Sequence, residues 1–328
     1  MTTLRGVVRS YGAAVRRAER DQQRRAKEAA TRFKQQQKHE DLQNATQAVS
    51  DWNEYVNMLK SVHKNCTELI DWDEIKNTPK PIEPTLDNNQ ETLAKKKLDS
   101  YKPSLLDKVF GSTNKKIANL QNQLNQAKDK DKKDYELALK QFEEETNNWI
   151  ELSEIAKGVH KQDPKAYENA LIYFDPFSDI SELGARLSFS FNNNNINIDL
   201  HINDEGIIPN YELKQTSTGK LSKKDMSKSN FNELYQDHIC SAVLRVAREV
   251  FAYLPIEQAR INAIAKLLNS KTGYIEDKPV LSVIIPPATI NSLNLDSIDP
   301  SDSMKNFVHN MNFKKTTGFI EIQKVALG

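Results

Sequence analysis

Cysteine, glycine and proline are scarce in this 328-residue sequence, and no apolar run is long. The two cysteines, Cys66 and Cys240, exclude a disulfide scaffold and a cysteine-based metal cluster, and they indicate buried thiols in a reducing compartment. The longest apolar run, residues 280–288, contains one serine and two prolines and is far too short to span a bilayer. The first residues lack the uninterrupted apolar core of a signal peptide. We therefore expect a cytoplasmic protein with no membrane contact.

A large net charge is also missing, since 46 Lys and Arg residues oppose 45 Asp and Glu residues. The balance is uneven along the chain, however. Residues 1–40 contain eleven basic and four acidic side chains, a net charge of +7, which leaves −6 for the remainder. Apolar residues make up only 38% of the chain and charged residues 28%, a composition that favours long solvated helices over one large core.

The N-terminal part has the apolar periodicity of a helix. Between residues 42 and 66, two series of residues with seven-residue spacing interleave, the pattern of a coiled-coil seam. Neither proline nor glycine occurs between Gly12 and Pro79, so one helix from about residue 4 to 70 is compatible with the sequence, as is a bend near residues 35–41. The two series are Leu42, Val49, Val56 and His63, and Ala45, Trp52, Leu59 and Cys66.

A proline-rich connector at residues 77–89 separates this helix from a second long helix that starts at Ser112 or Thr113. The second apolar seam changes phase across residues 128–134, a charged run that is either a solvated stutter or the tip of a helical hairpin; we favour the stutter. The two long helices predict an antiparallel coiled-coil hairpin, and we assign residues 1–175 to this arm. The seam aromatics then serve packing and imply no cofactor.

Residues 176–328 predict a compact α/β domain with the element order β-β-β-α-β-β-α-β, so that the whole chain is of the α+β class. The central helix, residues 231–254, is apolar on more than one face and carries a narrow polar stripe, which indicates a buried helix under a mixed sheet. The other expected elements are strands at 187–191, 196–202, 207–215, 260–268, 280–285 and 318–325, and helices at 287–293 and from 300 to about 311.

Several familiar catalytic motifs are absent. Lys214 occupies the position at which a phosphate-binding loop ending in Gly219-Lys220 needs its first glycine. The six histidines lack the spacing of zinc ligands, and the chain contains neither a Gly-x-Ser-x-Gly elbow nor a glycine-rich dinucleotide loop. We therefore expect no cofactor.

One set of residues could still carry chemistry. Glu212 and Lys214 point to the same face of their strand, and a hairpin turn near residues 204–205 would bring Asp199 to that face from the preceding strand. The pattern resembles the PD-(D/E)xK site of restriction-endonuclease-like enzymes, although Asp199 does not follow a proline. The resemblance implies that Asp199 and Glu212 bind Mg²⁺ and that all three residues are catalytic. The alternative is an exposed strand face of alternating charge.

Two groups of basic residues could contact nucleic acid or an acidic protein, or could simply be solvated. Arginine is concentrated near the N-terminus, whereas lysine prevails in the loop after residue 214. The candidates are Arg16, Arg17, Arg20, Arg24, Arg25, Lys220, Lys223 and Lys224.

The sequence therefore favours a non-enzymatic coiled-coil protein, a scaffold or assembly component that binds a protein partner or itself through the arm. The alternative is a Mg²⁺-dependent nuclease. Convergence of Asp199, Glu212 and Lys214 in one open cleft would support the nuclease.

Overall fold

The computed structural model describes residues 27–29, 31–32, 45–104, 112–178, 185–192, 194–202, 205–217 and 220–326. The chain is α+β and divides into two compact units. Of the described residues, the first unit contains those within 73–154, and the second contains those up to residue 72 and from residue 155 onward. We call them the arm unit and the sheet unit. This division differs from the boundary expected at residue 175, because residues 45–72 and 155–174 belong with the sheet.

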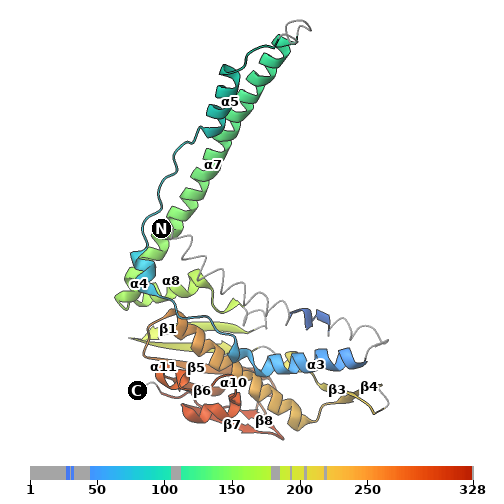
Figure 1. Cartoon of the computed structure of the whole chain (residues 1–328). Helices are drawn as coiled ribbons and strands as arrows, with labels where there is room; N and C mark the ends of the chain where they lie inside the picture. Colours follow the sequence, from blue (N-terminus) through green and yellow to red (C-terminus); the bar gives the residue numbers. More distant parts are fainter. Residues whose placement is uncertain are drawn as a thin grey trace. The chain divides into compact units, whose positions relative to one another are not determined.

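The arm unit is built on α7 (Thr113–His160), whose residues up to Glu154 belong to it (Figure 1). The helix continues without a break through residues 128–134, so this charged run is not the tip of a helical hairpin. A charged run without glycine or proline removes no backbone hydrogen bond, so the helix can continue while its apolar seam changes phase.

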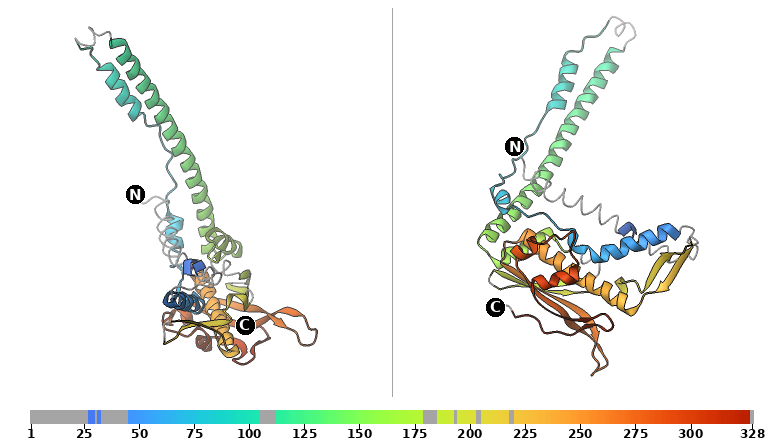
Figure 2. Two further views of the ribbon diagram at one scale, coloured as in Figure 1. Left: turned by 90° about the vertical axis from the view of Figure 1, so that its right-hand side faces the viewer. Right: turned by 60° about the horizontal axis from the view of Figure 1, so that its bottom comes forward.

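A short helix and an extended segment lie along α7. Helix α5 (Asn89–Asp99) is beside the first half of α7 in both views of Figure 2. Asp131 of α7 accepts a hydrogen bond of 2.8 Å from the backbone N–H of Glu91, one of the N–H groups that the first turn of α5 leaves without an intrahelical partner. Lys128 pairs with the Glu91 carboxylate at 3.4 Å. Trp149 Nε1 donates to Thr78 O at 2.8 Å, which ties the start of the extended segment to α7. The unit also contains most of α4 (Trp72–Asn77).

The expected hairpin partner of α7 lies in the sheet unit instead. Helix α3 (Ala45–Lys60) packs against α10 (Lys228–Tyr253) and β3 (Tyr211–Gln215), so the prediction of one helix reaching residue 70 is wrong. After Lys60 the chain forms the short 3-10 helix η2 (Val62–Lys64), because side chains of α10 bind its backbone: His63 N donates to Ser241 Oγ and Arg248 Nη1 donates to His63 O. The rest of the predicted first helix lies largely outside the described residues.

The sheet unit contains a six-stranded mixed sheet in the order β1-β2-β5-β6-β7-β8. All neighbours are antiparallel except β2 and β5, which run parallel. The strands are β1 (Arg186–Asn192), β2 (Asn195–His201), β5 (Gln258–Leu268), β6 (Ile275–Ile285), β7 (Val308–Lys314) and β8 (Gly318–Ile320).

A separate two-stranded sheet pairs β3 with β4 (Leu221–Asp225), antiparallel. The remaining elements are α8 (Pro164–Phe174), η3 (Glu205–Ile207), α11 (Pro287–Asn291), α12 (Pro300–Ser303) and η4 (Met304–Asn306).

The core lies between this sheet and α10, as expected. Nineteen of the 26 residues of α10 are buried, and Pro255 follows soon after its end. One set of alternating strand residues contributes the fully buried aliphatic side chains, among them Ile198, Ile261 and Val283, which are opposite one another in the strand register. Alternation therefore places the other set, which is polar, on the opposite face.

Three sequence expectations for the strands need correction. The segment expected as a basic loop contains β4, because pairing with β3 supplies the order that its polar sequence does not signal. The helix that starts at Pro300 ends at Ser303, and β7 follows because β6 offers it an edge. The last strand ends at Ile320 rather than Val325.

Within the described part of the chain, no helix has both the length and the apolar character required to cross a membrane.

Candidate functional site

The three residues of the predicted metal site lie on two different sheets. Asp199 is on β2, which pairs with β1 and β5, whereas Glu212 and Lys214 are on β3, which pairs with β4. The hairpin between residues 196–202 and 207–215 is therefore not formed, and the geometric basis of the PD-(D/E)xK resemblance is missing. The physical reason is that β5 and β4, both later in the sequence, provide the neighbours that β2 and β3 take.

Glu212 and Lys214 do share a strand face, as predicted, but they bind each other. Lys214 Nζ is 2.8 Å from Glu212 Oε2, and Asn230 Nδ2 donates to Glu212 Oε1 at 2.8 Å. The hydrogen bond from Lys214, followed by that from Asn230, lowers the pKa of Glu212. This carboxylate is thus a stable anion at the surface.

The predicted basic contacts divide into two groups. Lys220, Lys223 and Lys224 are exposed at the β3–β4 hairpin, and Lys223 Nζ lies 4.0 Å above the centre of the Tyr211 ring. The arginines Arg16, Arg17, Arg20, Arg24 and Arg25 lie outside the described residues. Contact of either group with nucleic acid or an acidic partner stays a prediction.

Asp199 belongs to a polar row that crosses five strands of the large sheet. In the strand register, Asp199 pairs with Ser188 on β1 and with Asn262 on β5; Asn262 pairs with Ser282 on β6, which in turn pairs with Asn310 on β7. Paired residues of neighbouring strands point to the same face. The row therefore lies on the face opposite the α10 core. We call this surface, centred on Asp199, Asn262 and Ser282, the polar face.

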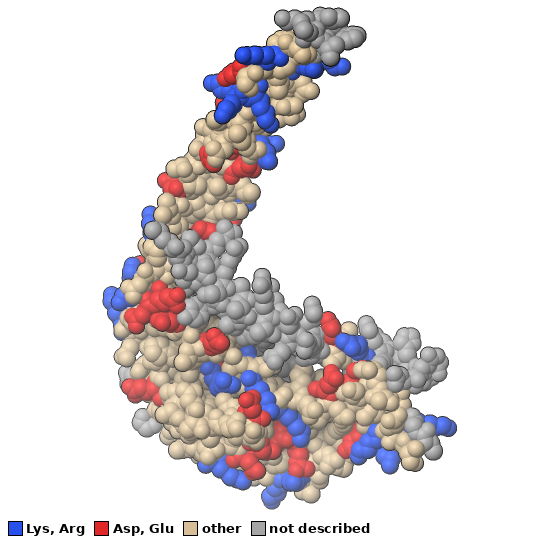
Figure 3. All heavy atoms as spheres, in the orientation of Figure 1, with Lys and Arg blue, Asp and Glu red and all other residues tan. Residues whose placement is uncertain are grey.

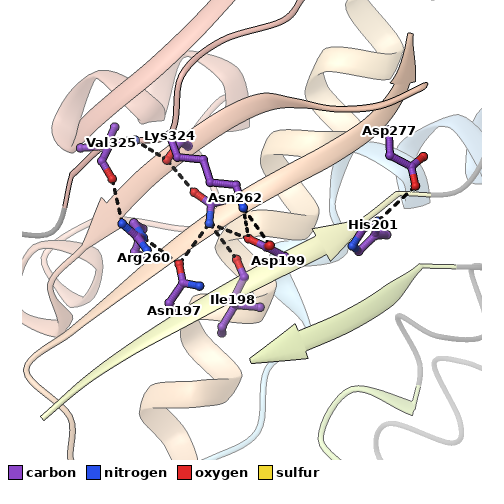
Figure 4. Close-up of polar contacts among 10 residues, drawn as sticks. Asn197, Ile198, Asp199, His201, Arg260, Asn262, Asp277, Lys324 and Val325 are labelled. Atoms are coloured by element: carbon purple, nitrogen blue, oxygen red, sulfur yellow. Dashed lines mark hydrogen bonds and ion pairs between the residues drawn. The ribbon is translucent and has the colours of Figure 1, made fainter. Parts of the chain in front are cut away.

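Asn262 is the centre of the hydrogen-bond network on this face (Figure 4). Its Nδ2 donates to Asp199 Oδ1 at 2.7 Å and to Asn197 Oδ1 at 3.1 Å, and its Oδ1 accepts from Ser282 Oγ at 2.7 Å. Arg260 Nε donates to Asn197 Oδ1 at 2.7 Å. Asn262 and Ser282 are fully buried, so this network satisfies groups whose burial would otherwise be costly.

The C-terminal segment, residues 321–326, covers these side chains; we call it the C-terminal strap. Val325 N donates to Ser282 Oγ at 2.9 Å, and Arg260 Nη1 donates to Val325 O at 3.1 Å. Lys324 Nζ lies 2.8 Å from each carboxylate oxygen of Asp199 (Figure 4). Burial by itself raises the pKa of Asp199, but the hydrogen bonds from Lys324 and Asn262 outweigh it and lower the pKa. Asp199 is therefore an anion that holds a lysine.

A second polar cluster lies along the narrow polar stripe of α10. His63 Nδ1 and Ser241 Oγ are 2.8 Å apart, the distance of a nucleophile and its base, yet His63 is 1% exposed and Ser241 is fully buried. His63 Nε2 is 3.0 Å from Leu295 O, and Thr67 N donates to Glu249 Oε1 at 3.0 Å. This stripe holds the segment after α3 in place and offers no access to a substrate.

A groove of about 630 Å³ lies between α3, α10 and α12. Glu212 is among the residues that line it, together with Trp52 and an ion pair of Lys60 and Asp237 whose charged atoms are 3.0 Å apart. Burial raises the pKa of Asp237, and Lys60 opposes that effect. Asp199 is not part of this lining, so the groove does not unite the predicted site residues.

Sequence reasoning found Asp199 but missed Arg260, Asn262, Ser282 and Lys324. The available signal was the alternation of polar residues along β2 and β5. The polar side of such a strand is normally solvated, so the alternation did not indicate a buried network. These side chains come together under the strap because of the way the strands pair, and alternation along a strand does not specify its neighbour. Among the described residues, no group of three or more His, Cys, Asp or Glu side chains is placed to share a metal ion.

No protein family matches this sequence, and neither the curated proteins nor the solved structures contain a significant match.

Proposed function

We propose that this protein is a non-enzymatic assembly component of the cytosol whose arm unit associates with the arm unit of a second copy. One observation carries this proposal: over residues 113–151 of α7, Asp131 is the only buried side chain. A helix of this length is normally stabilised by packing of its apolar face rather than by helix propensity alone. The single chain leaves that packing incomplete.

The incomplete packing follows the seam of α7. Its residues recur at steps of three or four, or at sums of such steps, and each remains partly accessible. Among the described residues, α5 and the extended segment 78–88 lie along α7. A second helix along the seam would complete knobs-into-holes packing. The seam residues are Leu120, Leu124, Ala127, Tyr135, Ala138, Phe142 and Trp149.

The charges of α7 favour an antiparallel arrangement of two arms. Residues 113–134 contain six lysines and three aspartates, whereas residues 135–154 contain one lysine and six glutamates. Figure 3 shows the blue side chains gathered near the tip of the arm and red ones further along it. Antiparallel pairing places the basic half of one helix beside the acidic half of the other, and parallel pairing would place like charges together.

The remaining polar candidates support a binding role rather than catalysis. Asp199 binds the strap, Glu212 binds Lys214, and the His63–Ser241 pair is buried. A nuclease would need Asp199, Glu212 and Lys214 to converge, and they lie on separate sheets. Cys66 and Cys240 are not joined in a disulfide, which agrees with the predicted reducing compartment.

Sedimentation velocity of the full chain over a wide concentration range tests the proposal. We expect concentration-dependent dimerisation that weakens as salt is added. Two charge reversals should each raise the dimer dissociation constant roughly 10- to 100-fold, because three exposed ion-pair positions contribute about 0.2–1 kcal/mol each and become repulsive. The reversals are Glu143→Lys with Glu144→Lys and Glu151→Lys, and Lys130→Glu with Lys132→Glu and Lys133→Glu.

An equimolar mixture of the two reversed proteins should associate again, since opposite charges face each other once more. The control carries the same change of charge on the β3–β4 hairpin: Lys220→Glu with Lys223→Glu and Lys224→Glu should dimerise like the unmodified chain. A protein that stays monomeric at all concentrations would contradict the proposal, as would loss of association in the hairpin control alone.

A further inference from the structure

The C-terminal strap is bound mainly through its main chain. Arg260 and Ser282 bind the carbonyl and the N–H of Val325, and Asn310 Nδ2 donates to Gln323 O at 2.9 Å. Ile322 N donates to Pro279 O at 3.0 Å. Groups that bind backbone atoms accept any sequence that can take the same extended path.

Three strap side chains make specific contacts with the sheet, and the first is Glu321, whose Oε1 lies 3.2 Å from Lys278 Nζ on β6. Ile322 is buried, and Lys324 forms the two-oxygen contact with Asp199, whereas Gln323 is exposed. The surface therefore favours an extended backbone with an acidic residue, an aliphatic residue directly after it and a lysine two residues further on. Residues 321–326 are not part of the β-ladder, so apart from the Ile322–Pro279 backbone hydrogen bond their binding depends on side-chain contacts.

The polar face has a hydrogen-bond network of its own, which does not depend on the strap. Asn262 of β5 links Asp199 and Asn197 of β2 to Ser282 of β6 by hydrogen bonds that involve no strap atom. Removal of the strap would leave donors and acceptors in position for another segment, and the Asp199 carboxylate would again need a cation.

We propose that the polar face is a peptide-binding site for an extended, lysine-bearing segment of a partner protein, and that the C-terminal strap occupies it in cis as a competitor. Asp199 selects the lysine; Arg260, Ser282 and Asn310 bind the peptide backbone. The tethered strap is present at high effective concentration, so a partner segment must displace it. This site is independent of the arm and goes beyond the proposed self-association.

A binding experiment on the full chain tests this site. The probe is a fluorescent synthetic peptide, Glu-Ile-Gln-Lys-Val-Ala, which has the sequence of residues 321–326. Fluorescence anisotropy should show weak binding to the unmodified chain. Lys324→Ala should bind the peptide about tenfold more tightly, because the apparent dissociation constant falls as the competent, strap-free fraction rises.

Asp199→Asn should abolish peptide binding, and a peptide with glutamine in place of lysine should not bind either protein. The two partners of one ion pair thus give opposite effects, which a purely structural ion pair would not produce. Asp277→Asn is the matched control, because Asp277 is an exposed carboxylate near His201 at the same sheet and should leave binding unchanged.

Circular dichroism of each variant separates loss of the site from loss of the fold. If Asp199→Asn does not fold, the double variant Ser282→Ala with Lys324→Ala takes its place. This double variant should bind the peptide more weakly than Lys324→Ala alone. Equal peptide binding by the unmodified chain and by folded Lys324→Ala would overturn the proposal. Dimerisation that Lys324→Ala abolishes would instead show exchange of straps between copies.

Discussion

The long helices of the arm unit and the sheet unit differ in how far other elements bury them. In the sheet unit, α10 is covered by the sheet on one side and by α3 and η2 on another, and 19 of its 26 residues are buried. In the arm unit, α7 buries one residue over 113–151. The first helix is packed by other elements of its unit, whereas the second remains largely accessible among the described residues. Similar helical periodicity thus accompanies a buried helix in one unit and a largely accessible helix in the other.

The largest expected effect contrasts a buried ion pair with an exposed one. Arg245 and Glu249 on α10 are 4% and 0% exposed and 2.9 Å apart. Glu249→Ala leaves the arginine buried without its carboxylate, so we expect a loss of about 3–5 kcal/mol of unfolding free energy. In the arm, Glu91→Ala removes the exposed pair with Lys128 and should change stability by less than about 1 kcal/mol. Urea denaturation measures both; similar losses would show that the arm is packed as well as the sheet unit.

A pair of leucine truncations tests the packing directly. Leu244 is fully buried in α10, and Leu244→Ala should cost about 2–5 kcal/mol. Leu124 on α7 is half-buried, and Leu124→Ala should cost about 1 kcal/mol in dilute monomer. If two arms associate, the effect of Leu124→Ala should grow with protein concentration while that of Leu244→Ala stays constant. Denaturation at two concentrations gives the result, and a concentration effect at Leu244 alone would contradict the assignment of the interface.

The two units should also differ in their response to acid. Burial lowers the pKa values of His63 and His238 below 6.5, the value in the unfolded chain, although backbone hydrogen bonds oppose the shift. As pH falls through that value, the unfolded chain takes up protons that the folded chain does not, so stability decreases by up to about 1.4 kcal/mol per pH unit for each histidine.

Denaturation of the sheet unit from about pH 7.5 to about pH 5.5 measures this effect, since histidine normally titrates within that range. The arm should keep its helix content there because residues 73–154 contain no histidine. A double variant with glutamine at positions 63 and 238 should lose most of the dependence; an unchanged slope would assign it to other groups.

The smallest expected effect sharpens the description of the arm. Asp131→Ala removes the carboxylate that caps α5 at Glu91 and should cost about 1 kcal/mol, confined to the arm. Hydrogen exchange of the α5 backbone should become faster, while amides of α10 keep their rates. Asp129→Ala, an exposed aspartate two residues earlier, is the control. Faster exchange in both variants would mean that the negative charge of α7, rather than the hydrogen bond to the Glu91 backbone, stabilises α5.

Local signals in the sequence were sufficient where one segment decides its own conformation. The apolar period and Pro255 located α10, and the absence of helix breakers kept α7 continuous through its charged run. Prediction failed where a distant segment supplies the partner. β4 has a charged, polar sequence and forms only because β3 is beside it, and the first helix ends at Lys60 because α10 binds the backbone that follows. For the candidate site, alternation placed Asp199 on a polar strand face, but its expected neighbours were wrong.

The α+β class, the long helix with its uneven charge and the scarcity of cysteine can all be read from composition and short-range periodicity. The tertiary structure alone decided which faces meet. An apolar or polar period defines a face of a helix or strand but does not specify which other face packs against it. One surface brings together four polar residues only because strands far apart in the chain pair; these residues are Asp199, Asn262, Ser282 and Lys324.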